Sequence, residues 1–259
     1  MRHTHLMCAA VRNEAENDAG VTALRLTAVL TAFGPGDGPL GVSELARRTG
    51  IAKSSVHRLI GHLVGNGLLE RDGTSVRLGL KLFEIGQLAI RQRGLVDAAR
   101  PHLADLREAT RNTVHLAVLE GAEVVYLDIL RGPDAPRLPS RIGGRFPAHA
   151  TAVGKAILAF SEQSEVDGVI AGGLARVSTR TITAPGLLKR QLTKIRAEGI
   201  AYEREESGTG VVCAASPVLG GDGKPVAALS ISGWVNRVRT ERVGPAVRTA
   251  ALALSRALT

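Results

Sequence analysis

Apolar residues recur at helical spacing in the first third of the chain and are interrupted by glycine-rich turns. Such a pattern over residues 21–33 predicts a first helix, which GPGDGP stops. A short second helix is expected next, with Ser43 as its N-cap and Gly50 at its end. A third helix is expected over 53–66, because its apolar residues are spaced to share one face: Val56, Leu59, Ile60 and Leu63.

The segment LLERDGTSVRLG comes next, with two short apolar-containing runs about a polar Asp72-Gly73 turn. This pattern predicts a β-hairpin. Three helices and a hairpin, in that order, are typical of a winged helix-turn-helix domain, which we expect over residues 19–79. The polar segment 1–18 has no sustained apolar period and is expected to be a disordered tail.

Beyond residue 110 the pattern changes to alternating apolar segments mixed with helical ones. A linker helix is expected over 80–98, and Pro101 suits the first turn of a further helix through Leu106. Strands are expected in TVHLAVLEG, AEVVYLDIL, GIAYERE and PVAALSISG, and helices over 151–160, 187–198 and 244–258. Residues 99–259 are therefore predicted to form an α+β domain.

Charge and composition narrow the classes of partner. The 259 residues carry a net charge of +9, which favours a polyanionic partner, but the excess is spread over residues 1–94 (+4) and 95–259 (+5). Only four Phe, two Tyr and one Trp are present, too few for base-stacking platforms, so duplex DNA is the expected nucleic acid. With two cysteines, no apolar run long enough for a membrane span and no secretory signal, the chain is expected to be cytoplasmic.

The third helix carries the candidate DNA-reading residues. Its N-terminal part would enter the major groove, and its polar side holds Lys53, Ser54, Ser55, His57 and Arg58. Arg71 and Arg77 flank the hairpin tip, where a wing would touch the DNA backbone or minor groove. Two alternatives to DNA binding remain. The polar side of the helix can simply be solvated, which is the commonest role of a charged stripe on a helix, or the winged helix can bind another protein.

Three features suggest catalysis but fail on inspection. Gly154-Lys155 invites a phosphate-loop interpretation, yet that motif needs Gly and Ser or Thr where this chain has His149 and Ala156. Cys213 and His149 could form a nucleophile and its base, but a structural Cys is commoner. The acids of YEREE are expected to be solvated. We therefore predict no enzyme activity, no metal and no cofactor.

Small and polar residues cluster in GTGVVCAASP and ALSISG, where strands rich in Ser, Gly and Cys can surround a compact polar ligand. Ser230 and Ser232, two residues apart on one strand, would point to the same face and together could donate hydrogen bonds to a carboxylate. The second domain is therefore predicted to be a small-molecule sensor.

Over residues 20–257 the chain resembles the IclR-type transcriptional regulators. The resemblance rests on IAKSSVHRLIGHLVGNGLL, GGRFPAHATAVGKAILA and GIAYEREESGTGVVCAASPVLGGDGKPVAALSISG. It implies a GAF-like effector-binding domain, a homodimer through the heads and connector helices, often a dimer of dimers, and binding to palindromic promoter DNA. The expected function is that of a regulator, a repressor, controlled by a small organic acid.

The resemblance also implies the effector contacts. They fall on Ala152 and Val153 after His149, and on Glu203, Cys213, Ser230 and Ser232. Glu203 stands where a glyoxylate-type pocket has Asp, and its longer side chain favours a different or larger ligand. The alternative function is a metabolite-binding protein or enzyme that uses the winged head only for oligomerisation.

Overall fold

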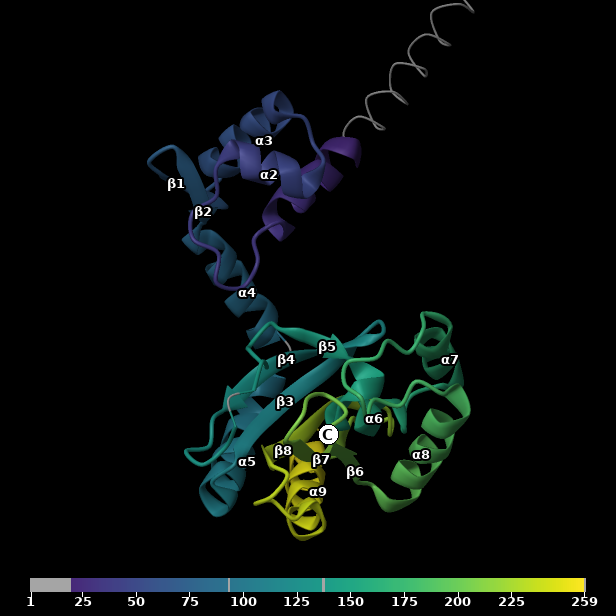
Figure 1. Ribbon diagram of the computed structural model, residues 1–259. Helices are drawn as coiled ribbons and strands as arrows, with labels where there is room; N and C mark the ends of the chain where they lie inside the picture. Colours follow the sequence, from purple (N-terminus) through teal and green to yellow (C-terminus); the bar gives the residue numbers. More distant parts are fainter. Residues whose placement is uncertain (1–19, 93, 137, 259) are drawn as a thin grey trace, which may run out of the picture. The chain divides into compact units, whose positions relative to one another are not determined.

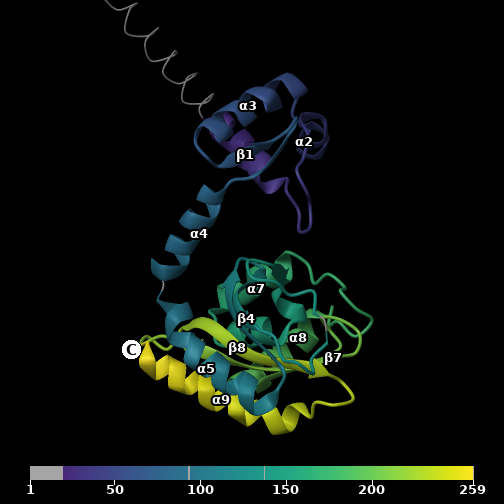
Figure 2. The same cartoon turned by 90° about the vertical axis from the view of Figure 1, so that its left-hand side faces the viewer.

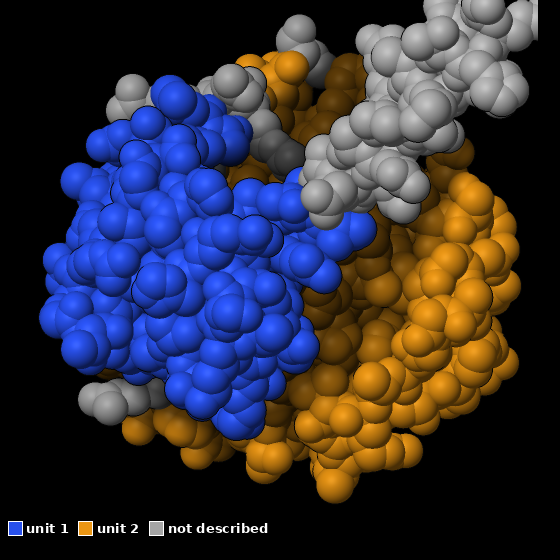
Figure 3. Space-filling view, turned by 90° about the horizontal axis from the view of Figure 1, so that it is seen from above, with its two compact units in different colours: residues 1–89 blue, residues 90–259 orange. Residues whose placement is uncertain are grey.

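The computed structural model describes residues 20–92, 94–136 and 138–258, and these divide into two compact units, 1–89 and 90–259 (Figures 1 and 3). The segment 1–18, predicted to be a disordered tail, lies outside the described residues. Within the described part of the chain, no helix is long and apolar enough to cross a membrane.

The first unit has the predicted order of elements. Residues 20–31 are helical and are followed by α2 (Val42–Thr49) and α3 (Lys53–Gly65). The strands β1 (Leu69–Asp72) and β2 (Ser75–Leu78) form an antiparallel hairpin. The winged helix-turn-helix prediction is confirmed.

One apolar core holds this unit together, and the predicted inward face of α3 supplies nearly half of it. The i, i+3, i+4, i+7 spacing of Val56, Leu59, Ile60 and Leu63 brings their side chains onto the side of α3 that faces the core. Leu40 also pairs through its backbone with Val76 of the hairpin. The buried apolar residues are Val29, Leu40, Leu45, Val56, Leu59, Ile60, Leu63, Leu69 and Val76.

The start of α2 differs from the prediction. Gly41, not Ser43, is the N-cap, and Ser43 lies one residue inside the first turn. An ion-pair network holds this region instead, in which Arg48 contacts Asp37 and, at 2.7 Å, Glu44. The end agrees, because Gly50 caps α2 with φ of +70°.

The predicted single linker helix over 80–98 is wrong. The structure has two helices there, α4 (Leu80–Gln92) and α5 (Leu95–Thr110), with Gly94 at φ +60° as the N-cap of α5. Pro101, expected in a first turn, lies in the middle of α5. The prediction failed because the apolar spacing of α5 begins at Leu95 and Val96, which are buried in the second unit.

A six-stranded antiparallel sheet forms the centre of the second unit, in the order β5-β4-β3-β8-β7-β6. All four predicted strand segments are confirmed. The three-residue β5 had no detectable alternation. The strands are β3 (Thr113–Glu120), β4 (Glu123–Leu130), β5 (Arg145–Pro147), β6 (Ala201–Arg204), β7 (Val211–Leu219) and β8 (Pro225–Trp234).

Helices cover both faces of this sheet. On one face, α5 lies beside α9 (Thr240–Ala257), as Figure 2 shows. The other face carries η1 (Ala148–Ala150), α6 (Ala152–Leu158), α7 (Gln163–Ala171) and α8 (Pro185–Glu198). The α+β prediction is confirmed; GAF-like is a narrower label that stays a prediction.

Alternation along the central strands sorts side chains between these faces. On β8, Leu229 and Ile231 enter the core under α5 and α9, whereas Ser230 and Ser232 point to the α6 face. On β3, His115 points the same way as Ser230, its register partner. Polar side chains of neighbouring strands therefore converge under α6.

Candidate functional site

A cavity of about 160 Å³ lies between the α6 face of the sheet and the start of α6. Five of the six predicted effector-binding residues line it: Ala152, Val153, Cys213, Ser230 and Ser232. The sequence pattern could bring them together because the two serines share a strand face and Cys213 stands opposite Ser232 in the register of β7 and β8.

Cys213 and Ser232 are hydrogen-bonded, with 3.0 Å between Sγ and Oγ. Burial raises the pKa of the Cys213 thiol well above its ordinary value. The side chain is therefore a neutral thiol at neutral pH and a poor nucleophile, which agrees with the prediction that it is not catalytic.

His115 lines the same cavity and was not identified from the sequence. Its Nε2 lies 3.0 Å from Ser140 Oγ, and its Nδ1 lies 3.4 Å from Ser230 Oγ. Burial, assisted by the nearby Arg131 charge, lowers the pKa of His115 to about 3. The imidazole is therefore neutral, with one nitrogen that donates and one that accepts.

The rest of the cavity wall is largely apolar and includes Tyr126, Leu138, Phe146 and Val211. The Tyr126 ring packs at 5.2 Å, centroid to centroid, against the His115 imidazole. No Lys or Arg is among the lining residues in the described part of the chain. A bound anion would therefore be held by neutral hydrogen-bond donors.

Glu203 is placed differently from the expectation, because it does not line the cavity. Its Oε1 accepts hydrogen bonds from the backbone N–H groups of Glu206 and, at 2.9 Å, Ser207. Burial raises the pKa of this carboxyl. Glu203 thus holds the turn that presents Ser207, Gly208 and Thr209 to the cavity.

The start of α6 is set by a cap and by close backbone packing. Thr151 Oγ1 accepts a hydrogen bond from Gly154 N at 3.1 Å, while Ala152 and Val153 begin the helix, where N–H groups have no intrahelical acceptor. A Cβ on Gly154 would lie 2.1 Å from the carbonyl oxygen of Ala148. Glycine is therefore required where α6 crosses η1.

The contacts do not support the phosphate-loop and cysteine-nucleophile interpretations. Lys155 is fully buried, so it is not a phosphate-loop lysine. His149 Nε2 lies 3.0 Å from the carbonyl oxygen of Ala175, whereas Cys213 bonds Ser232. The acids of YEREE, expected to be solvated, include the buried Glu203 and Glu206, so that prediction is wrong for these two.

In the first unit, α3 presents the predicted polar side to solvent. Lys53, Ser54, His57 and Arg58 are exposed, and Ser55 is half-buried. No side chain caps the start of α3, so its first N–H groups are open to a phosphate. In the described part of the chain, no ion pair engages Lys53 or Arg58.

The two predicted wing arginines differ in their contacts. Arg77 pairs with Glu70 at 3.1 Å, and the same carboxylate accepts a hydrogen bond from Leu80 N at the start of α4. Arg71 is exposed and has no such partner among the described residues. Arg71 is therefore the freer of the two cations.

Comparisons with known proteins identify the family. The sequence profile of the IclR helix-turn-helix domain matches residues 22–73, and that of the bacterial transcriptional regulator IclR C-terminal domain matches residues 87–256. The chain belongs to the IclR family of transcriptional regulators. Its curated relatives are named as regulators rather than enzymes.

Two curated relatives and one solved structure show how far the similarity extends. The chain is 32% identical to the HTH-type transcriptional regulator XynR of Escherichia coli over 90% of this chain and 95% of that protein. It is 30% identical to the transcriptional repressor IclR of Escherichia coli, over 80% and 77%. An IclR homolog from Microbacterium hydrocarbonoxydans, complexed with 4-hydroxybenzoate, superposes with a TM-score of 0.84 at 29% identity, covering 92% and 98%.

Proposed function

We propose that this regulator is a repressor that binds a palindromic promoter site as a dimer, and that a small organic acid in the cavity beside Cys213, Ser230 and Ser232 controls it. The observation that carries the proposal is the combination, in one IclR-family chain, of an unpaired basic face on α3 with a cavity that sets Ser230 and Ser232 against an apolar wall.

For DNA recognition, the support is the chemistry of α3. Lys53 and Arg58 can reach guanine acceptors or phosphates, and Ser54, Ser55 and His57 add neutral hydrogen-bonding groups on the same side. Arg71 and Arg77 on the hairpin add backbone contacts. Like the E. coli repressor IclR, this chain is proposed to block transcription when bound.

For the effector, the support is the arrangement of neutral donors above an apolar wall. Ser230, Ser232 and the first N–H groups of α6 can donate to a carboxylate, while Tyr126 and Phe146 suit a carbon skeleton. The related structure with 4-hydroxybenzoate makes an organic acid the first class to test. Glu203 is proposed to support this site through its turn.

The dimer is supported by the apolar side chains that α4 exposes to solvent when one chain is considered alone. Four large apolar side chains on this one helix are half or more exposed, which a partner subunit would cover. They are Leu80, Phe83, Ile85 and Leu88. A pairing of two heads would present two α3 helices to the two halves of a palindrome.

The test screens small organic acids by thermal shift, because a ligand specific for the folded state raises the Tm. An acid that stabilises the chain is then added to the protein bound to DNA from upstream of its own gene. The proposal expects a Tm rise that Ser230→Ala with Ser232→Ala removes, and a change in DNA affinity. A stabilising acid that leaves DNA affinity unchanged would favour the alternative of a metabolite-binding protein.

A further inference from the structure

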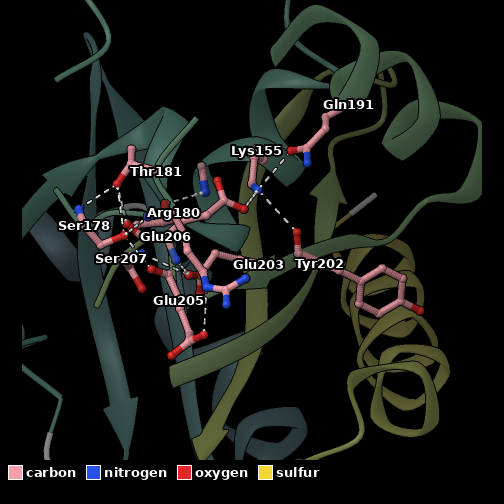
Figure 4. Close-up of polar contacts among 12 residues, drawn as sticks. Lys155, Ser178, Arg180, Thr181, Gln191, Tyr202, Glu203, Glu205, Glu206 and Ser207 are labelled. Carbon is pink, nitrogen blue, oxygen red and sulfur yellow. Dashed lines mark hydrogen bonds and ion pairs between the residues drawn. The ribbon is translucent and has the colours of Figure 1, made fainter. Parts of the chain in front are cut away.

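Lys155 is a fully buried lysine on α6, the helix whose first residues line the cavity, and the proposed function assigns it no role (Figure 4). It lies on α6, three residues after Ala152. Its Nζ donates to Glu206 Oε1 at 2.6 Å, to Gln191 Oε1 at 3.1 Å and to the carbonyl oxygen of Tyr202 at 3.3 Å. Three acceptors satisfy the three donors of the ammonium group.

Its main partner, Glu206, belongs to the turn that lines the cavity. Glu206 is buried, and its backbone carbonyl accepts a hydrogen bond from Thr181 Oγ1 at 2.8 Å. The next residues, Ser207, Gly208 and Thr209, form part of the cavity lining. The ion pair therefore joins α6, which supplies one wall, to the turn that supplies another.

The turn is held at several further points. Ser178 Oγ donates to the carbonyl oxygen of Glu205 at 2.6 Å, and Arg180 pairs with the Glu205 carboxylate at 3.0 Å. Glu205 has φ of +61°, a conformation that a non-glycine residue adopts only when its surroundings enforce it. The Lys155–Glu206 pair is the anchor that reaches from this turn to α6.

We propose that Lys155 and Glu206 are a positioning pair that sets the separation of the two cavity walls, and through it the affinity for the effector, without either side chain touching the effector. The effector part rests on the proposed function. The positioning part does not, because it concerns the cavity walls alone.

A buried pair of this kind is sensitive to the loss of one partner. Removing one charge leaves the other buried without compensation, whereas removing both relieves that penalty. Glu206 Oε2 has no hydrogen-bond partner among the described residues, so the carboxylate has little to retain it once Lys155 is gone. The contacts to Ser178, Arg180 and Thr181 stay, but the link from the turn to α6 is lost, so we expect the two cavity walls to separate.

Cys213 provides a probe that needs no knowledge of the effector. It lines the cavity, and with Cys8 changed to Ser it is the sole cysteine of the chain. The rate at which methyl methanethiosulfonate modifies Cys213 at pH 8 depends on access to the thiol and on its thiolate fraction. The Lys155 charge lowers the pKa of Cys213, so loss of Lys155 by itself would slow the reaction, and a faster reaction reports a more open cavity. In the parent Cys8→Ser protein we expect slow modification, because the thiol is buried.

The experiment measures this rate in Lys155→Met, in Glu206→Gln and in the double variant. We expect at least a tenfold increase in Lys155→Met, a smaller increase in Glu206→Gln, and a double variant slower than Lys155→Met. The control is Lys189→Met, which removes an exposed lysine paired with Asp167 on the same face of the sheet. It should leave the rate unchanged.

A folded Lys155→Met whose Cys213 reacts within twofold of the parent would overturn the proposal. If Lys155→Met does not fold, Glu206→Gln decides, because its amide still accepts a hydrogen bond from Lys155; an unchanged rate there would also contradict the positioning role. An acid found by thermal shift should slow the modification in the parent. If no acid protects Cys213 while Lys155→Met still accelerates its reaction, the effector assignment fails and the positioning pair stands.

Discussion

Cys213 Sγ and Ser232 Oγ lie 3.0 Å apart on adjacent strands, and the two residues are directly opposed in the register of β7 and β8. This contact fixes two of the polar groups that face the cavity. It also explains how residues far apart in the sequence form one site, because the antiparallel pairing of β3, β8 and β7 carries His115, Ser230, Ser232 and Cys213 to one place.

The neutral His115 predicts a pH dependence of stability. Its pKa is about 3 in the folded chain and 6.5 when unfolded, so the unfolded state binds the extra proton between these values. The stabilisation is present above pH 6.5 and is lost as pH falls toward 3. Between pH 7.5 and 5 we expect a loss of about 2 kcal/mol from this residue.

Urea unfolding followed by Trp234 fluorescence measures this effect, because Trp234 is the sole Trp and lies in the second unit. The matched variant is His115→Asn, which should lose about 2 kcal/mol less over the same pH range. Equal losses in both proteins would show that His115 is not buried as a neutral imidazole.

Gly154→Ala should destabilise the second unit, because its Cβ would meet the Ala148 carbonyl oxygen at 2.1 Å. We expect a cost of about 3 kcal/mol, at the upper end for overpacking, since backbone rather than a flexible side chain must move. Gly168→Ala is the control, since it lies within α7 and a Cβ there meets nothing within 4 Å. It should stabilise by about 0.5–1 kcal/mol. Equal unfolding midpoints for the two variants would contradict the packing at η1.

The two wing arginines should differ in their effect on DNA binding. Arg71→Ala should lower the slope of log affinity against log salt by about 1, as expected for one lost phosphate contact. Arg77→Ala should change it less, because Arg77 is paired with Glu70. Glu70→Gln should free Arg77 and strengthen binding. Anisotropy at several salt concentrations measures all three, and a larger effect of Arg77→Ala than of Arg71→Ala would be inconsistent with the pairing.

The exposed apolar side of α4 predicts which substitutions would break the proposed dimer. Phe83→Lys with Leu88→Lys places two charges where a partner would pack and should produce monomers in light scattering after size exclusion. Leu187→Lys with Leu252→Lys is the control, because those side chains are exposed on α8 and α9. If the double α4 variant has the same mass in solution as the parent, α4 does not form the dimer interface.

Features that depend on local spacing could be predicted from the sequence. The helical spacing of Val56, Leu59, Ile60 and Leu63 indicated α3 and its exposed basic side, and alternation placed Ser230 and Ser232 on one face. His115 was missed because its partner Ser140 lies 25 residues away in a segment without regular structure. Lys155 has its acid 51 residues away, so nothing near it in the sequence indicated burial.

The predicted ends of helices were wrong where the apolar pattern of one helix is followed closely by that of the next. The apolar spacing of α4 stops before the polar residues 91–94 and that of α5 begins at Leu95, so the single helix predicted over 80–98 covers parts of two helices. Glu203 was assigned to the effector from the family pattern, but in this chain its carboxylate accepts backbone N–H groups of the 205–209 turn. The donors from which a buried carboxylate accepts hydrogen bonds depend on tertiary contacts that the sequence alone does not give.

DNA binding by variants of Lys53 and Arg58 decides whether α3 reads duplex DNA. Anisotropy on DNA from upstream of the gene compares the parent with Lys53→Ala, Arg58→Ala and with the matched control Lys189→Ala, Lys194→Ala on α8. We expect a loss of affinity and a salt slope lower by about 2 for the α3 variant only. Unchanged affinity and salt slope in the α3 variant would contradict it.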